Sequence, residues 1–101
     1  MQKKLVLAKL RIMKKEDKTE LIAVFKKGIS ETKAKTVLDQ SGAVYRPGMD
    51  SSRGKIYFYK TGPKYILTFD NEHARKKFIS GYKDRAEIYE VYVPDWSIQK
   101  D

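Results

Sequence analysis

A run of five consecutive apolar residues, Leu21 to Phe25, constrains this chain more than any other feature. Side chains of a strand alternate between the two faces of its sheet. A strand whose odd-numbered and even-numbered residues are both apolar is therefore typical of a sheet position that is buried on both faces. We predict that Glu20 to Lys26 is a central strand, and any fold of this chain must cover both of its faces.

A helix is predicted directly after this strand. The segment 27–29 contains a glycine that interrupts the strand, Ser30 is suited to cap a helix, and Glu31 is favourably placed in its first turn. Gly42 supplies a stop signal at the other end. The predicted helix covers about residues 31–41, with apolar residues at helical spacing at Ala34, Val37 and Leu38.

The remaining sequence predicts further strands, turns and one more helix. Alternation of apolar and polar residues favours a strand over Leu5 to Met13, with a continuous helix as the alternative. The other predicted elements are a strand at 43–45 that ends at Arg46-Pro47-Gly48, a loop at 49–54, a hairpin of strands 55–60 and 65–69 joined by a turn at 61–64, a helix that starts at Asp70-Asn71 and ends or kinks at Gly81, a strand at 86–93, and a tail after Pro94.

This order of elements predicts an α+β fold. Two helices that alternate with strands in a short chain favour a two-layer sandwich with an antiparallel sheet. The expected plan is ferredoxin-like βαββαβ, with an extra N-terminal strand at 5–13 and an inserted hairpin. The 101 residues fit one domain, 1–101, with its core at 20–94 and a tail at 95–101.

The composition excludes several classes of function. The chain has no Cys, and its one histidine, His73, is interpreted as a solvent-facing helix residue. No nucleophile elbow, dinucleotide fingerprint or Walker pattern occurs. We therefore predict a non-enzymatic protein with no catalytic residue, no metal site and no cofactor. No apolar run is long enough for a signal peptide or a membrane span, so we expect a cytoplasmic protein rather than a secreted or membrane one.

The excess positive charge supports one alternative function. The chain has 22 Lys and Arg against 13 Asp and Glu, a net charge of +9. These cations are dispersed among acids, which favours a solvated surface. The alternative is a single-stranded nucleic-acid site on segment 53–59, which resembles the conserved octapeptide of the RNA-recognition motif with only one aromatic residue at a stacking position. Its candidate residues are Arg53, Lys55, Tyr57, Tyr59 and Lys60.

A broader resemblance covers residues 20–96. The segment ELIAVFKKGIS at 20–30, the helix after it and the turn Ser41-Gly42-Ala43-Val44 resemble the opening of subtilisin propeptides, a family that includes free-standing peptidase inhibitors. The second half keeps the family's order, with a strand at 65–69, a helix beginning Asn71-Glu72 and a last strand ending Val93-Pro94-Asp95. The segment 46–60 and the N-terminal strand have no counterpart in the family pattern.

This resemblance implies an inhibitor or chaperone of a subtilisin-like serine protease. The open sheet face would pack on two surface helices of the protease, and the tail would add a strand to its substrate cleft. An acidic side chain would cap one of the partner's helices. The residues so implied in protein binding are Asp50, Pro94, Asp95, Trp96, Ser97 and Ile98. A further alternative is homodimerisation through Ile56 and Phe58.

Overall fold

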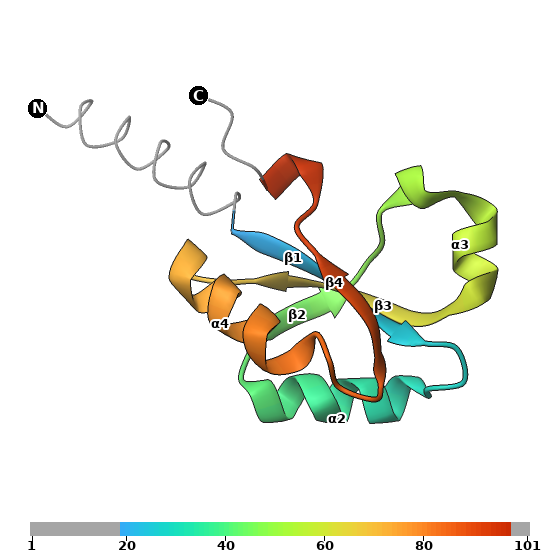
Figure 1. Ribbon diagram of the computed structural model, residues 1–101, viewed down its shortest axis with the longest axis horizontal. Coiled ribbons are helices and arrows are strands. Elements are labelled where there is room, and N and C mark those ends of the chain that lie inside the picture. The colour runs from blue at the N-terminus through green and yellow to red at the C-terminus, as the bar shows by residue number, and fades with distance from the viewer. Residues whose placement is uncertain (1–18, 98–101) are drawn as a thin grey trace, which may run out of the picture.

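The computed structural model describes residues 19–97, so the predicted strand at 5–13 lies outside the described residues. The described part is a small α+β domain (Figure 1). Its elements are β1 (Glu20–Lys26), α2 (Glu31–Ser41), β2 (Val44–Pro47), the 3₁₀ turn η1 (Ser51–Arg53), α3 (Gly54–Lys60), β3 (Thr61–Thr68), α4 (Glu72–Tyr82), β4 (Ile88–Tyr92) and the 3₁₀ turn η2 (Asp95–Ser97).

The strand β1 lies in the interior of a four-stranded antiparallel sheet, which confirms its predicted central position. The strand order is β2-β3-β1-β4. Because β1 and β2 are both antiparallel to β3, they run parallel to each other with β3 between them. The strands β3 and β4 flank β1 in the same way. This order follows the ferredoxin-like βαββαβ plan for the described core.

The helix α2 forms as the sequence predicts because its ends are capped locally. The Ser30 hydroxyl accepts a hydrogen bond from the Lys33 backbone N–H at 3.1 Å. At the other end Gly42 adopts φ 78°, in the left-handed region, and its N–H donates to the Asp39 carbonyl. The helix buries Ala34, Val37 and Leu38 against the sheet.

The helix α4 covers the same face of the sheet as α2. The Asn71 side chain caps it by accepting from the Ala74 backbone N–H at 2.8 Å. The helix continues through Gly81 to Tyr82, so Gly81 does not end it. Figure 1 shows α2 and α4 together on one side of the sheet. Between them and the sheet lies the main core, which includes Leu21, Ala23, Phe25, Ala34, Val37, Leu38, Tyr65, Leu67, Phe78 and Ile88.

The predicted hairpin over residues 55–69 is wrong. Residues 54–60 form the helix α3, and the supposed turn at 61–64 is the first half of β3. The strand accommodates Gly62 and Pro63 because its pairing with β1 shifts register between Val24 and Lys26. A Cβ at Gly62 would lie 2.3 Å from the Lys26 carbonyl oxygen, so the close approach of the two backbones requires glycine.

Contacts within the chain favour the helix over the predicted strand at 55–60. The Asp50 carboxylate accepts from the Ser52 backbone N–H at 3.0 Å, which starts the turn η1. Gly54 then takes φ 83°, a conformation that L side chains rarely adopt. At the other end the Thr61 hydroxyl donates to the Tyr57 carbonyl at 2.7 Å and satisfies one of the free carbonyls of the last turn.

We expect Gly62→Ala to lower the free energy of unfolding by about 2 kcal/mol, because its new methyl group would overlap the Lys26 carbonyl. Gly81→Ala is the matched control. No heavy atom lies within 4 Å of a Cβ at that helical position, so the change should raise stability by about 0.5–1 kcal/mol. Urea unfolding of both variants measures the difference. Equal stabilities would contradict the close approach of β3 to β1.

Candidate functional site: the insert over the second sheet face

The second face of the sheet, opposite α2 and α4, is covered by the chain itself. Ile22 and Val24 point to this face because they alternate with the core residues of β1. They are only 1% and 0% exposed. The covering segment is residues 48–60, which we call the insert. Its first glycine, Gly48, lies so close to Ile66 that a Cβ there would be 2.5 Å from the Ile66 Cδ1 atom.

Arg53 joins the insert to β4. Its guanidinium carbon lies 3.9 Å from the ring centroid of Tyr92 and 5.1 Å from that of Tyr57. Its Nη1 atom forms an ion pair with Glu90 Oε2 at 3.3 Å. The same Glu90 oxygen accepts a hydrogen bond from the Tyr57 hydroxyl. The cation is thus held between two aromatic faces and one carboxylate. We call Asp50, Arg53, Tyr57, Glu90 and Tyr92 the Arg53 cluster.

The protonation states of the Arg53 cluster favour this network. Burial, together with the neighbouring Glu90 carboxylate, raises the pKa of Tyr57 well above its ordinary value. Burial also raises the pKa of Tyr92 to about 12. Both hydroxyls therefore remain donors at neutral pH, and that of Tyr92 donates to Asp50 Oδ2 at 3.1 Å. The Ser52 hydroxyl holds the pKa of Asp50 below its usual range, which keeps that carboxylate ionised.

The opposite side of α3 faces outward. Ile56 and Tyr59 are 75% and 72% exposed. They are three residues apart, so they lie on the same side of the helix. Lys55 and Lys60 are exposed beside them. These four residues form what we call the α3 surface. Phe58 is half-buried, with the Lys64 ammonium 5.0 Å from its ring centroid.

The structure divides the five residues of the predicted nucleic-acid site. Arg53 and Tyr57 belong to the Arg53 cluster, where the guanidinium and the hydroxyl are both engaged by Glu90. Lys55, Tyr59 and Lys60 are exposed on the α3 surface. Because the segment is a helix and not a strand, its aromatic rings do not form a flat row on an open sheet.

The predicted tail residues begin on their own domain. Pro94 is fully buried and Asp95 is exposed. The Trp96 indole N–H donates to Glu20 Oε1 at 2.5 Å, while 45% of the residue stays exposed. The other carboxylate oxygen of Glu20 accepts from Arg46 Nη2 at 3.1 Å. Ser97 ends the turn η2, and Ile98 lies outside the described residues.

Sequence reasoning missed three residues that hold these parts together, namely Glu20, Glu90 and Tyr92. Glu20 links β1 to Arg46 and to Trp96. Glu90 and Tyr92 share one parity of β4 and bind the insert. The sequence did contain one signal, a charged residue on the face of the strand that points into the protein. Such a side chain needs a polar or charged partner. The identity of that partner could not be read from the strand alone.

Residues 19–97 contain no group of three or more His, Asp or Glu side chains that could hold a metal ion. None of the helices in this part of the chain is long and apolar enough to cross a membrane. His73 is exposed on α4.

Comparisons with known proteins return no match to a protein-family model, to a curated protein or to a solved structure. The resemblance to subtilisin propeptides therefore has no support from a family match. What stands is the α+β domain with its four-stranded antiparallel sheet.

We expect Glu90→Ala to loosen the insert, because it leaves Arg53 and the Tyr57 hydroxyl without their common partner. The free energy of unfolding should fall by about 1–2 kcal/mol, allowing for the partial exposure of the pair. Hydrogen exchange of the amides in 54–60 should become faster. Asp39→Ala is the control, since Asp39 also accepts from a tyrosine hydroxyl, that of Tyr45, but in an exposed position. Unchanged exchange in α3 would contradict the role of Glu90.

Proposed function

We propose that this chain is a non-enzymatic protein-binding module of the propeptide-inhibitor type, which contacts its partner through the α3 surface and the C-terminal tail. One observation carries the proposal. Ile56 and Tyr59, two large apolar side chains, are about three-quarters exposed on a helix whose other side is fixed to the sheet. Aromatic and aliphatic side chains of this kind supply much of the binding energy of protein interfaces.

The fixed position of α3 supports this role. The Arg53 cluster holds the insert to β4, and the Thr61 hydroxyl holds the last turn of the helix. A preorganised surface loses less conformational freedom on binding than a mobile one. The helix therefore presents Ile56 and Tyr59 in one arrangement before a partner arrives.

Charge indicates what kind of protein surface fits the α3 surface. Lys55 and Lys60 lie beside the apolar pair, and neither forms an ion pair with another residue of the described part. The complementary surface is an apolar depression with acidic residues at its rim. The net charge of +9 would speed encounter with such a partner.

At a finer level we propose that the partner is a subtilisin-like serine protease. The resemblance over residues 20–96 implies this partner, and the strand order β2-β3-β1-β4 is compatible with it. The mode of contact must differ from the family pattern, since the insert covers the sheet face that the family leaves open. Asp50 accepts from Ser52 and Tyr92, and Pro94 is buried, so binding rests on the α3 surface and on the chain from Asp95 onward.

The full-length chain should inhibit a subtilisin-like protease at micromolar concentration, measured as residual hydrolysis of a peptide substrate. Ile56→Asp should raise the inhibition constant about tenfold or more, because it places a charge in the apolar contact. Val44→Asp is the matched control, since Val44 is 70% exposed on β2, which carries none of the α3 surface. Absence of inhibition contradicts the protease as partner, and equal effects of both variants contradict the α3 surface.

The oligomeric state must be measured with the same samples. The predicted alternative of homodimerisation used Ile56 and Phe58, and only Ile56 is exposed. Sedimentation equilibrium of the native chain and of Ile56→Asp separates the two possibilities. A dimer that the variant dissociates would assign the α3 surface to self-association.

One observation favours single-stranded nucleic acid as a second candidate partner. Tyr59 presents an exposed ring next to the exposed Lys60, with Lys55 on the same helix. An aromatic platform with nearby cations is typical of sequence-tolerant binding to single strands. The acidic Glu90 and the engagement of Arg53 and Tyr57 reduce the extent of such a site.

If nucleic acid is the partner, Tyr59→Ala should weaken binding of a fluorescent oligothymidine by about 1–3 kcal/mol, because stacking on the ring is lost. Affinity should also fall steeply with salt concentration. Lys60→Gln should weaken binding more than the same change at Lys83, which is a lysine at the end of α4. Binding that is absent, or that does not respond to salt, would reject this candidate.

A further inference from the structure

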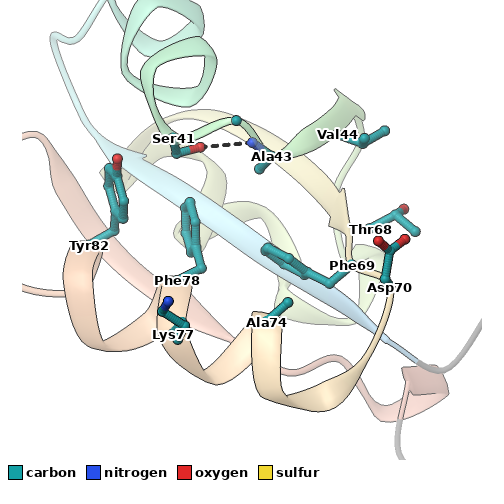
Figure 2. A pocket seen from close by; sticks show the side chains of 11 residues that line it. Ser41, Ala43, Val44, Thr68, Phe69, Asp70, Ala74, Lys77, Phe78 and Tyr82 are labelled. Carbon is teal, nitrogen blue, oxygen red and sulfur yellow. Dashed lines mark hydrogen bonds between the residues drawn. The ribbon is translucent and has the colours of Figure 1, made fainter.

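A second concave site lies on the helical side of the molecule, away from the insert. It is a pocket of about 380 Å³ between the end of α2, the start of β2, the end of β3 and one side of α4 (Figure 2). This volume is in the range of small-ligand sites. Neither the Arg53 cluster nor the α3 surface contributes to it, and the proposed function does not use it.

One wall of the pocket is aromatic. Phe78 and Tyr82 are stacked, with ring centroids 4.5 Å apart and an angle of 8° between the rings. Phe69 lies beside them, and its ring centroid is 5.6 Å from that of Phe78. Figure 2 shows these three side chains on the side of the pocket opposite Ala43 and Val44. The small residues Ala43 and Ala74 leave the space in front of the rings open.

The two ends of the pocket carry opposite charges. Lys77 lies on α4, and Asp70 lies in the chain just before the N-cap of that helix (Figure 2). Among the described residues Lys77 has no ion-pair partner. The Ser41 hydroxyl is already used, because it donates to the Leu38 carbonyl and accepts from the Ala43 N–H. Lys77 is therefore the available cation next to an apolar wall.

We propose that this pocket binds a small apolar monocarboxylate. Its ring or short alkyl chain lies against Phe69, Phe78 and Tyr82, and its carboxylate pairs with the Lys77 ammonium. An ion pair beside an aromatic wall is less screened by water than one on an open surface. Asp70, at the other end, repels a second carboxylate, so the pocket prefers monoanions to dianions of similar size.

The experiment uses three probes that share a phenyl ring, namely 4-phenylbutyrate, its neutral amide 4-phenylbutyramide, and the dianion phenylsuccinate. Binding to the full chain is followed by chemical-shift changes of its backbone amides. We expect 4-phenylbutyrate to bind about five- to tenfold more tightly than the amide, and more tightly than the dianion. The shifts should concentrate in residues 41–44, 68–70 and 74–82. Equal affinity for acid and amide, shifts elsewhere, or no shifts at the solubility limit would overturn the proposal.

Two variants identify the binding residue. Lys77→Met keeps an unbranched apolar side chain but removes the ammonium group, and it should abolish the preference for the acid over the amide. Lys76→Met is the matched control, because Lys76 is also exposed on α4 but does not line the pocket, and it should leave the preference unchanged. Ala74→Leu should weaken binding of all three probes, because its larger side chain fills the space in front of the rings. If that variant does not fold, the comparison of the two lysine variants decides the outcome.

Discussion

Burial of β1 on both faces is the constraint on which the rest of this structure depends. Leu21, Ala23 and Phe25 are covered by α2 and α4, as expected for a two-layer sandwich. Ile22 and Val24 would face solvent in a sheet with helices on only one side, and leaving them exposed would cost about 1.5–3 kcal/mol each. The insert contacts their neighbours on this face, Ile66, Glu90 and Tyr92, and both side chains are removed from water. A small domain gains much of its stability from such additional burial.

Covering the second face also determines which surface is left for the proposed partner. The face that a bare ferredoxin-like sheet would offer is occupied, and α3 becomes the outer layer on that side. The same contacts that engage Tyr57 and Arg53 leave Ile56 and Tyr59 on the solvent side of the helix. The contacts that stabilise the insert therefore also hold the proposed binding surface in position. A change at Glu90 is expected to affect both.

Local sequence signals were sufficient to predict an element where the residues that it contacts lie only a few positions away in the chain. Ser30 and Asn71 cap their helices by contacts three residues away, and both helices begin where the sequence predicts. The prediction of a strand at 55–60 was wrong because the aromatic and β-branched residues of this segment favour a strand when they are considered alone. Local contacts of Asp50 and Thr61 flank the helix that forms instead, and a distant partner, Glu90 on β4, joins it to the sheet. Gly62 and Pro63 likewise indicated a turn, whereas the register shift with β1 places them in a strand.

The sequence by itself determined the central strand, the two capped helices, their order and hence the α+β class, because hydrophobic periodicity and capping act over short distances. It also determined the absence of Cys and the excess of positive charge. Only the tertiary structure decided that residues 54–60 of the insert form a helix, that Glu20 binds Trp96 and Arg46, and that Phe69, just after β3, meets Phe78 and Tyr82 of α4 in one pocket. These features join residues that are distant in the chain. Their contacts contribute to the free energy of folding only after the strands have assembled into the sheet.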